Sequence, residues 1–179
     1  MIFKHLIPVE ILSAGCPTTL EIDINGKNVF SQLFEANSEQ KIDIEFVKKY
    51  NNGEKNKITF KWNGAEEYQH KHLKINSIVI NDQVVNLYNS EYFPELSQEW
   101  WDNLSAEEQE KYNQIINGNI GNVFGWYGEI NFYFCTGQDL KSKHKYNKNN
   151  KDPRRLLDEQ ISWIYMEKQD ARLYNKVNV

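Results

Sequence analysis

Between Thr18 and Ile80 the chain alternates apolar and polar residues in short runs, and the runs are separated by Asn-Gly pairs. Side chains on a strand point alternately to opposite faces, so each run predicts a strand with one buried face. Asn-Gly suits the positive φ angles of a type I′ hairpin turn. The pairs are Asn25-Gly26, Asn52-Gly53 and Asn63-Gly64. The pattern predicts a mainly β protein, an antiparallel sandwich of jelly-roll type.

A later alternating run, Glu129–Cys135, predicts the strand that completes the two sheets. Before it lies a segment with helical spacing, in which Ser105 and Glu108 have the spacing of a capping box. We therefore predict a sandwich domain over residues 1–140 with a helical insertion at about 91–117. The glycine-rich stretch 118–128 is expected to be a tight, ordered loop that leads into the last strand.

The end of the chain predicts a different element. Residues 141–152 form a basic linker without periodicity, and Asp152-Pro153 has the form of a helix start. We predict an amphipathic helix over Arg154–Leu173 within a C-terminal unit of residues 153–179. The helix could pack on its own sandwich or reach a neighbouring molecule. Its apolar face would comprise Leu157, Ile161, Ile164 and Tyr165.

Charge is distributed unevenly along the chain. The net charge of -4 and the pI near 5.6 argue against nucleic acid as the principal partner. Residues 91–110 hold seven acidic residues and no basic one, whereas residues 141–155 hold five Lys and two Arg against one Asp. Both stretches could be solvated surface, or they could meet complementary surfaces on neighbouring copies or partners. No stretch is apolar enough for a secretion signal or a membrane span, so no membrane partner is expected.

Candidate catalytic and metal chemistry is sparse. Cys16 and Cys135 lie far apart and lack CxxC or Cys-His spacing, so they are expected to be buried free thiols. His70 and His72 would share a strand face and could reach one metal, and Asp82 could supply an oxygen ligand. The sequence does not identify the other ligands of a zinc site, and a solvated loop or strand edge is the alternative. The sequence predicts no catalytic residues, no metal and no cofactor. An enzyme whose site is assembled from distant residues stays open as a third alternative.

Two pairs of aromatic residues lie in polar or glycine-rich surroundings, Trp100-Trp101 and Trp126-Tyr127. At least one ring of each pair is expected near the surface. Such rings could form a local mini-core under the insertion, anchor a protein interface or stack on a sugar.

Three segments carry a family resemblance: Thr18–Gly26, Ile58–Gly64 and His72–Asn81, the last with the pattern Leu-x-Ile-x-x-Ile-x-Ile. With the glycine-rich segment 118–134, they resemble small jelly-roll domains of the carbohydrate-binding-module type. In particular, they resemble the calcium-dependent xylan-binding-like domains in structural proteins of tailed phages, including T4-like phages and cyanophages. The resemblance covers residues 18–135 and implies the scaffold and a virion setting. No calcium or sugar ligand of those relatives matches a defined position in this chain.

These observations lead to a functional hypothesis. We predict a non-enzymatic structural or accessory subunit of a tailed bacteriophage virion, in the tail, neck, baseplate or head surface. Its partners would be other virion proteins and further copies of itself, and it would be located in the virion after assembly in the host cytoplasm. The alternative is a carbohydrate-binding module that recognises host surface polysaccharide. The predicted partner-binding residues are Trp100, Trp101, Trp126, Tyr127, Arg154, Arg155, Ile161, Ile164 and Tyr165.

Overall fold

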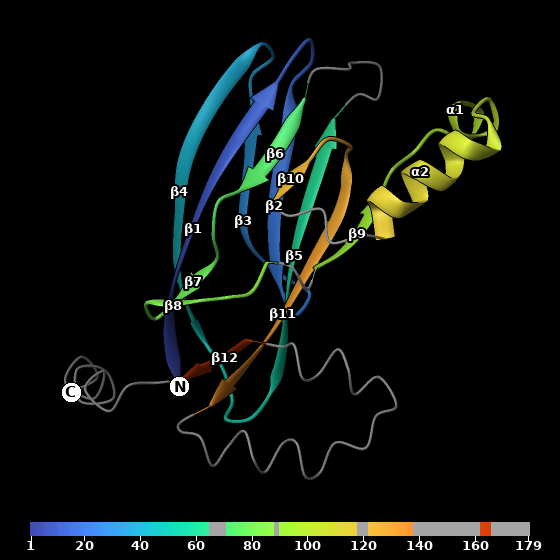
Figure 1. The fold of residues 1–179 in the computed structure, drawn as a ribbon. Coiled ribbons are helices and arrows are strands. Elements are labelled where there is room, and N and C mark those ends of the chain that lie inside the picture. The colour runs from blue at the N-terminus through green and yellow to red at the C-terminus, as the bar shows by residue number, and fades with distance from the viewer. Residues whose placement is uncertain (65–70, 88–89, 118–121, 138–161, 166–179) are drawn as a thin grey trace.

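Two sheets packed face to face form the body of the protein (Figure 1). This computed structural model describes residues 1–64, 71–87, 90–117, 122–137 and 162–165. The first sheet contains β1 (Ile2–Ser13), β4 (Ser38–Lys49), β6 (His72–Ile75), β7 (Val79–Ile80), β8 (Gln83–Val84) and β10 (Val123–Phe124). The second contains β2 (Thr18–Ile24), β3 (Lys27–Phe34), β5 (Lys55–Gly64), β9 (Ser90–Pro94), β11 (Gly128–Gly137) and β12 (Ser162–Tyr165). The predicted mainly β, antiparallel, jelly-roll-like sandwich is confirmed.

Strand β1 is the centre of the first sheet, and β11 has the same place in the second. β1 pairs along its whole length with β4 and, on its other side, with β6 and β7. β11 pairs with β5 on one side. On its other side β9 pairs with residues 128–132 and β12 with residues 134–137. All these pairings are antiparallel except that of β12, which is parallel.

The core lies between the two sheets and follows the predicted alternation. Ile58, Phe60 and Trp62 of β5 are fully buried, as are Ile130 and Phe132 of β11. The rings of Phe60 and Phe132 meet edge to face with centroids 5.6 Å apart. Burial of each such side chain stabilises the fold by roughly 1.5–3 kcal/mol, so the interleaved rows hold the sheets together. The predicted buried thiols are confirmed, since Cys16 and Cys135 are both buried and neither forms a disulfide.

The Asn-Gly pairs have three different outcomes. Asn25-Gly26 makes the predicted hairpin turn, with φ of 52° and 75°. Gly53 has φ of 75°, but its turn joins β4 to β5 and therefore crosses between sheets. Asn63-Gly64 is not a turn, because β5 continues through Gly64 to pair with β2. A Cβ at Gly64 would lie 2.2 Å from the Tyr127 hydroxyl, so this glycine is needed for close packing.

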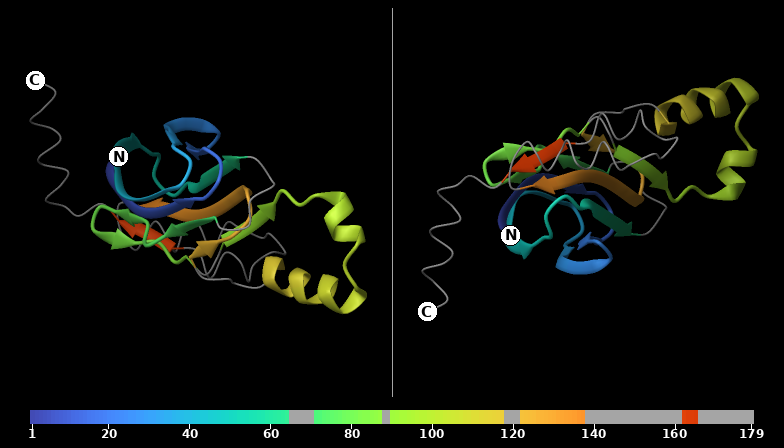
Figure 2. Two further views of the ribbon diagram at one scale, coloured as in Figure 1. Left: turned by 90° about the horizontal axis from the view of Figure 1, so that it is seen from above. Right: turned by 90° about the horizontal axis from the view of Figure 1, so that it is seen from below.

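The helical insertion forms an arm that projects from one end of the sandwich, as the views of Figures 1 and 2 both show. The arm consists of α1 (Gln98–Asp102) and α2 (Ala106–Asn117). The predicted capping box is present: the Ser105 N–H donates to Glu108 Oε2 at 2.9 Å, and the Glu108 N–H donates back to Ser105 Oγ at 3.3 Å. No helix in the described ranges is long and apolar enough to cross a membrane.

The predicted C-terminal helix over Arg154–Leu173 is wrong at residues 162–165, which form strand β12. Ser162 pairs with Phe134 and Tyr165 with Gly137, and Ile164 is 1% exposed within the core. Burial of Ile164 beside β11 outweighs the local helix-start signal, because tertiary packing overrides weak intrinsic propensity. The linker 141–152 and the residues Arg154, Arg155 and Ile161 lie outside the described residues.

Candidate functional site

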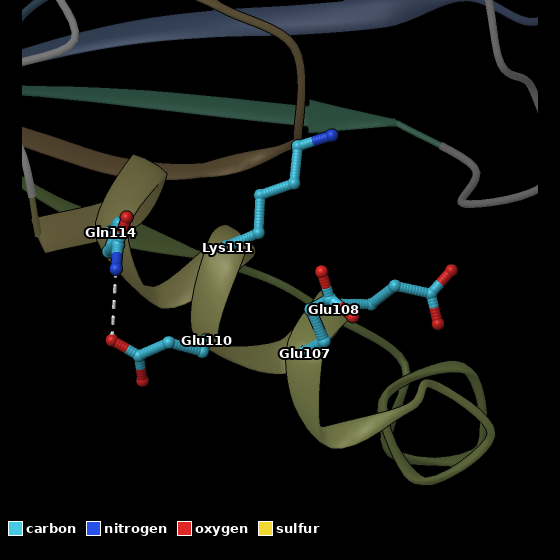
Figure 3. A pocket seen from close by; sticks show the side chains of 5 residues that line it. All are labelled: Glu107, Glu108, Glu110, Lys111 and Gln114. Carbon is cyan, nitrogen blue, oxygen red and sulfur yellow. Dashed lines mark hydrogen bonds between the residues drawn. The ribbon is translucent and has the colours of Figure 1, made fainter.

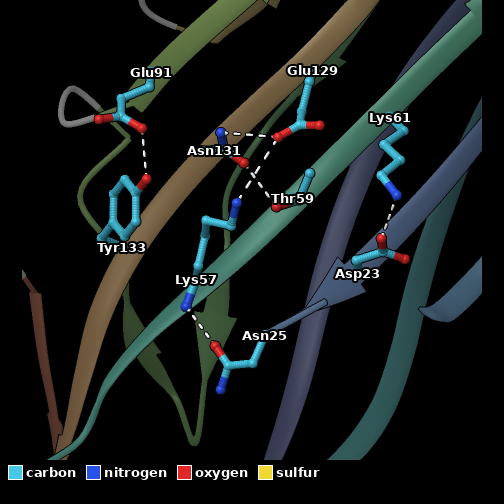
Figure 4. Close-up of polar contacts among 9 residues, drawn as sticks. All are labelled: Asp23, Asn25, Lys57, Thr59, Lys61, Glu91, Glu129, Asn131 and Tyr133. Atoms are coloured by element: carbon cyan, nitrogen blue, oxygen red, sulfur yellow. Dashed lines mark hydrogen bonds and ion pairs between the residues drawn. The ribbon is translucent and has the colours of Figure 1, made fainter. Parts of the chain in front are cut away.

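The outer face of the second sheet carries an array of paired polar side chains, which we call the polar sheet face (Figure 4). Strand alternation turns Ile130, Phe132 and Phe134 inward, so the intervening residues of β11 point outward. The register of β9, β5 and β2 brings matching outward side chains beside them. The face is formed by Asp23, Lys57, Thr59, Lys61, Glu91, Glu129, Asn131 and Tyr133.

Hydrogen bonds fix the centre of the polar sheet face. The Tyr133 hydroxyl donates to Glu91 Oε2 at 2.5 Å. The Thr59 hydroxyl donates to Asn131 Oδ1 at 2.7 Å, and Asn131 Nδ2 donates to Glu129 Oε1 at 3.2 Å. Asn131 is 2% and Thr59 4% exposed, so these bonds form a buried polar floor. Bonds of this kind hold a side-chain arrangement before any ligand arrives.

Ion pairs surround this floor and balance its charge. Lys61 Nζ lies 2.6 Å from Asp23 Oδ2, and Lys57 Nζ lies 3.9 Å from Glu129 Oε1. The hydrogen bond and the negative charge of Asp23 raise the pKa of Lys61 above its usual value. Each of the two lysines lies next to a carboxylate, so the face offers hydrogen-bond donors and acceptors side by side.

The aromatic residues of the arm form a continuous row that leads back to the sandwich. Trp100 contacts Trp101 and Tyr112, with ring centroids 6.2 and 5.2 Å apart, and Tyr112 contacts Trp126 at 5.7 Å. Trp126 is held in turn by Tyr92, whose hydroxyl donates to the Trp126 carbonyl at 2.6 Å. The row fits the mini-core alternative, while Trp100 stays 36% exposed at its outer end.

Tyr127, the fourth predicted aromatic, is 2% exposed and belongs to the core. Its ring meets Trp62 edge to face with centroids 4.8 Å apart, and Lys71 Nζ lies 3.8 Å from its centroid. Its hydroxyl is 3.5 Å from Cys16 Sγ, and burial raises its pKa. The structure thus separates the four aromatics: Tyr127 supports the sheets, Trp126 links body and arm, and Trp100 and Trp101 lie on the arm. Binding of a partner by these residues stays a prediction.

Replacing Tyr112 with alanine should detach the arm from the body without unfolding the sandwich, because its ring joins Trp100 to Trp126. Loss of a half-buried aromatic should weaken the arm locally by about 1–3 kcal/mol. Hydrogen exchange of the amides in α2 should accelerate about tenfold or more, while exchange in β5 and β11 stays unchanged. Lys111→Ala on the exposed side of the same helix is the control and should alter neither region. Equal exchange rates in the two variants would contradict this role for the row.

The exposed side of α2 holds a shallow hollow lined by Glu107, Glu108, Glu110, Lys111 and Gln114 (Figure 3). Gln114 Nε2 donates to Glu110 Oε1 at 3.1 Å, and the remaining side chains point apart. The lining comes from one helix and lacks facing groups, so it does not form a catalytic cleft. Among the described residues no group of three or more His, Cys, Asp or Glu is placed to hold a metal. His72 is half-buried, and its predicted partner His70 falls outside the described ranges.

The sequence predicted the side chains of the polar sheet face only as the hydrophilic half of an alternating strand. Glu129, Asn131 and Tyr133 alternate with apolar residues in the sequence, but no local signal placed Glu91 or Lys57 beside them. These side chains become neighbours through the register of β11 with β5 and with β9, which are far from β11 in the chain. Amide, carboxylate and hydroxyl groups on successive outward positions of a predicted strand are the signal that could have identified the face.

Comparison with known proteins gives one structural likeness. No protein-family model matches the chain, and no curated protein matches it. A solved structure of vCBM60, from work on two families of calcium-dependent carbohydrate-binding modules, is similar at 12% identity and a TM-score of 0.40, over 73% of this chain and 89% of that one. The structure of vCBM60 in complex with galactobiose is similar at 12% identity and a TM-score of 0.42, over 72% of this chain and 96% of that one.

Proposed function

We propose that this protein is a non-catalytic binding module and that it binds polysaccharide on the polar sheet face. The observation that supports this most is the buried floor of Thr59 and Asn131, rimmed by Glu91, Glu129 and Tyr133 and held by hydrogen bonds of 2.5–3.2 Å. Sugars present many hydroxyl groups that both donate and accept hydrogen bonds. The accessible side chains of the rim, Glu91, Glu129 and Tyr133, are held in advance by this floor and can bind those hydroxyl groups at low entropic cost.

Tyr133 adds the apolar component that a sugar ring requires. Its ring lies half-buried on the outer face, with Lys55 Nζ 5.1 Å from the ring centroid and the hydroxyl bound to Glu91. Phe93, 56% exposed on neighbouring β9, lies beside Glu129 in the register. Aromatic rings next to planar polar groups suit the alternating apolar and hydroxylated surfaces of a sugar.

The charge balance of the face selects the type of ligand. Lys57 and Lys61 are each paired with a carboxylate, so the face lacks the unpaired cations that a phosphate backbone requires. A neutral or weakly charged polysaccharide fits such a surface better than nucleic acid does.

Replacement of Tyr133 by alanine should lower the affinity for a bound glycan by about tenfold or more, because it removes both the ring and a charge-assisted hydrogen bond. The wild-type chain is first screened on a glycan array, and the best ligand is then measured by calorimetry. Glu45→Gln on β4 changes an exposed carboxylate on the other sheet and should leave the affinity unchanged. Absence of any glycan ligand, or equal affinity in the three proteins, would overturn the proposal. Unchanged polysaccharide length after incubation would agree with binding alone.

The projecting arm favours a second candidate, the structural subunit of a tailed phage particle. The arm leaves the sandwich after Pro94 and extends away from the core (Figure 2), and its helix α1 contains Trp100, which is 36% exposed. An exposed aromatic on a projecting element suits anchoring in a neighbouring subunit. Replacing residues 96–117 with a short Gly-Ser linker should abolish incorporation into a reconstituted particle and leave the sandwich folded. Incorporation at the wild-type level would contradict the assembly function.

A further inference from the structure

We propose that a glycan bound to the polar sheet face lies along β11, with one sugar ring on Phe93 and another on Tyr133. This inference rests on the glycan binding proposed above, and it names the form of the ligand. The site would take an extended run of several sugars from the interior of a linear polysaccharide. A single sugar would fill only part of it.

Phe93 and Tyr133 are the aromatic side chains that strands β2, β3, β5, β9 and β11 place on the outer side of the second sheet, because the other aromatic residues of these strands pack into the core. Phe93 is 56% exposed on β9 and pairs with Glu129. Tyr133 lies four residues after Glu129 on β11 and is half-buried. Residues four apart on a strand share a face, so both rings lie on the same side of the sheet.

The two aromatic residues are too far apart to contact the same sugar. Glu129 and Tyr133 are separated by about 14 Å along β11 at the usual rise per residue, and β9 lies about 5 Å to one side. A sugar ring is no larger than an aromatic ring, so it can cover only one of the two. A ligand that contacts both Phe93 and Tyr133 is therefore a chain of sugars that follows β11.

Polar side chains occupy the interval between the two aromatic residues (Figure 4). Glu91 pairs with Asn131, which is midway between Glu129 and Tyr133. The hydrogen bonds within the face engage Glu91 Oε2 at 2.5 Å and Glu129 Oε1 at 3.2 Å. The second oxygen of each carboxylate can accept a bond from a sugar hydroxyl, and a charged acceptor strengthens such a bond. A glycan along β11 would thus meet a ring, two carboxylates and a second ring in succession.

A path across the strands offers fewer contacts. Beyond Glu129, the outward positions in the same row are Lys61 of β5 and Glu21 of β2. Lys61 Nζ is engaged by Asp23 Oδ2 at 2.6 Å, and neither Lys61 nor Glu21 has a ring on which a sugar could stack. A glycan laid across the sheet would meet the ring of Phe93 alone. The path along β11 is the one that uses both aromatic residues.

This position of the glycan predicts a dependence of affinity on chain length. An oligosaccharide too short to reach both Phe93 and Tyr133 gains the contacts of one ring, whereas a longer one gains the contacts of both. Buried aromatic anchors dominate the free energy of binding at many sites, so the second ring should raise the affinity by about tenfold or more. Lengthening the chain further should add little.

Calorimetry with oligosaccharides of increasing length tests the inference. The probes are linear neutral oligosaccharides of glucose, of xylose and of galactose, from the disaccharide to the hexasaccharide. The affinity of the wild-type chain should rise by about tenfold or more once a probe reaches both rings, and then level off. Phe93→Ala and Tyr133→Ala should each bind the long probes as weakly as the wild-type chain binds the short ones. Circular dichroism checks that both variants fold.

Leu33→Ala and Glu21→Gln are the matched controls on the same side of the sheet. Leu33 is 60% exposed on β3, opposite Thr19 and away from β11, and Glu21 lies on the path across the strands. Both variants should keep the affinity and the length dependence of the wild-type chain. A length dependence that is lost in Glu21→Gln and kept in Phe93→Ala would place the glycan across the sheet and overturn the inference.

The results also separate failure of this inference from failure of glycan binding. An affinity that is the same for all probe lengths would overturn the position along β11 and leave glycan binding standing. So would a Phe93→Ala variant with wild-type affinity when Tyr133→Ala binds more weakly. Absence of binding by every probe and by every glycan on the array would overturn both proposals.

Discussion

Gly128→Ala should destabilise the protein by about 3 kcal/mol or more, because the new Cβ has no space. Gly128 has φ of 143°, and a Cβ at this position would lie 2.2 Å from the Phe93 carbonyl oxygen and 2.8 Å from the Pro94 Cα. Both are backbone atoms of β9, so no side-chain rotation can relieve the clash. β9 would have to separate from β11 at the point where the arm begins. Urea unfolding followed by circular dichroism measures the loss.

Gly26→Ala is the matched control for this result. Gly26 also has positive φ, 75°, but nothing lies within 4 Å of the position that a Cβ would take there. Its replacement should cost only the left-handed backbone strain, about 1 kcal/mol. Similar losses of stability in the two variants would show that backbone strain alone accounts for the effect of Gly128→Ala and that β9 is not closely packed on β11. In the expected case, Gly128→Ala should also accelerate hydrogen exchange in the arm, because β9 anchors it.

Acid should destabilise the protein through His5, which is fully buried in the core. Its Nε2 lies 2.9 Å from the Tyr50 hydroxyl, and its ring stacks on Phe46 with centroids 4.4 Å apart. Burial, with a smaller contribution from the charge of Lys48, lowers the pKa of His5 from 6.5 to about 3. The folded protein therefore keeps the imidazole neutral in a range of pH where the unfolded chain protonates it.

The sign of the pH dependence follows from that difference. Neutral His5 stabilises the fold fully above pH 6.5, which is the pKa of histidine in the unfolded chain. This stabilisation is lost as the pH falls from 6.5 towards 3, the pKa in the folded protein. By pH 4 the free energy of unfolding should drop by about 3 kcal/mol from this residue alone, at about 1.4 kcal/mol per pH unit. Urea unfolding at a series of pH values measures the slope.

His5→Gln separates this contribution from that of the carboxylates. Glutamine cannot stack on Phe46 as the His5 ring does, so the variant should be less stable than wild type at pH 7. Glutamine can still hydrogen-bond to Tyr50 but does not titrate, so the variant should lose less stability between pH 7 and pH 4. Acidic groups titrate in both proteins and cancel in the comparison. Parallel pH profiles for wild type and His5→Gln would show that His5 is not the group that responds.

The sequence predicted the sandwich well because its signals are local and repeated. The alternation in β2, β5 and β11 depends only on which face of a strand is buried, and the structure confirms it. The capping box at Ser105 is likewise a contact between residues three positions apart. Such features need no knowledge of distant partners, so a pattern of residue types suffices to find them.

Two wrong structural predictions concern residues with distant partners. Gly64 looked like a turn, yet it continues β5 and pairs with Thr18 of β2, and the absence of a Cβ leaves room for the Tyr127 ring. Ile164 matched a helical apolar face, yet it lies in β12 because a position beside residues 134–137 of β11 buries it. A chain cut at residue 151 would therefore lose β12, which is part of the sandwich.

The sequence by itself determined the strand pattern, the helical insertion and the separation of negative and positive charge along the chain. Only the tertiary structure decided which side chains become neighbours: Tyr133 with Glu91, Thr59 with Asn131, and Trp126 with Tyr112. The physical reason is that local periodicity specifies the face of each residue, whereas neighbours across a sheet depend on the register between strands distant in sequence.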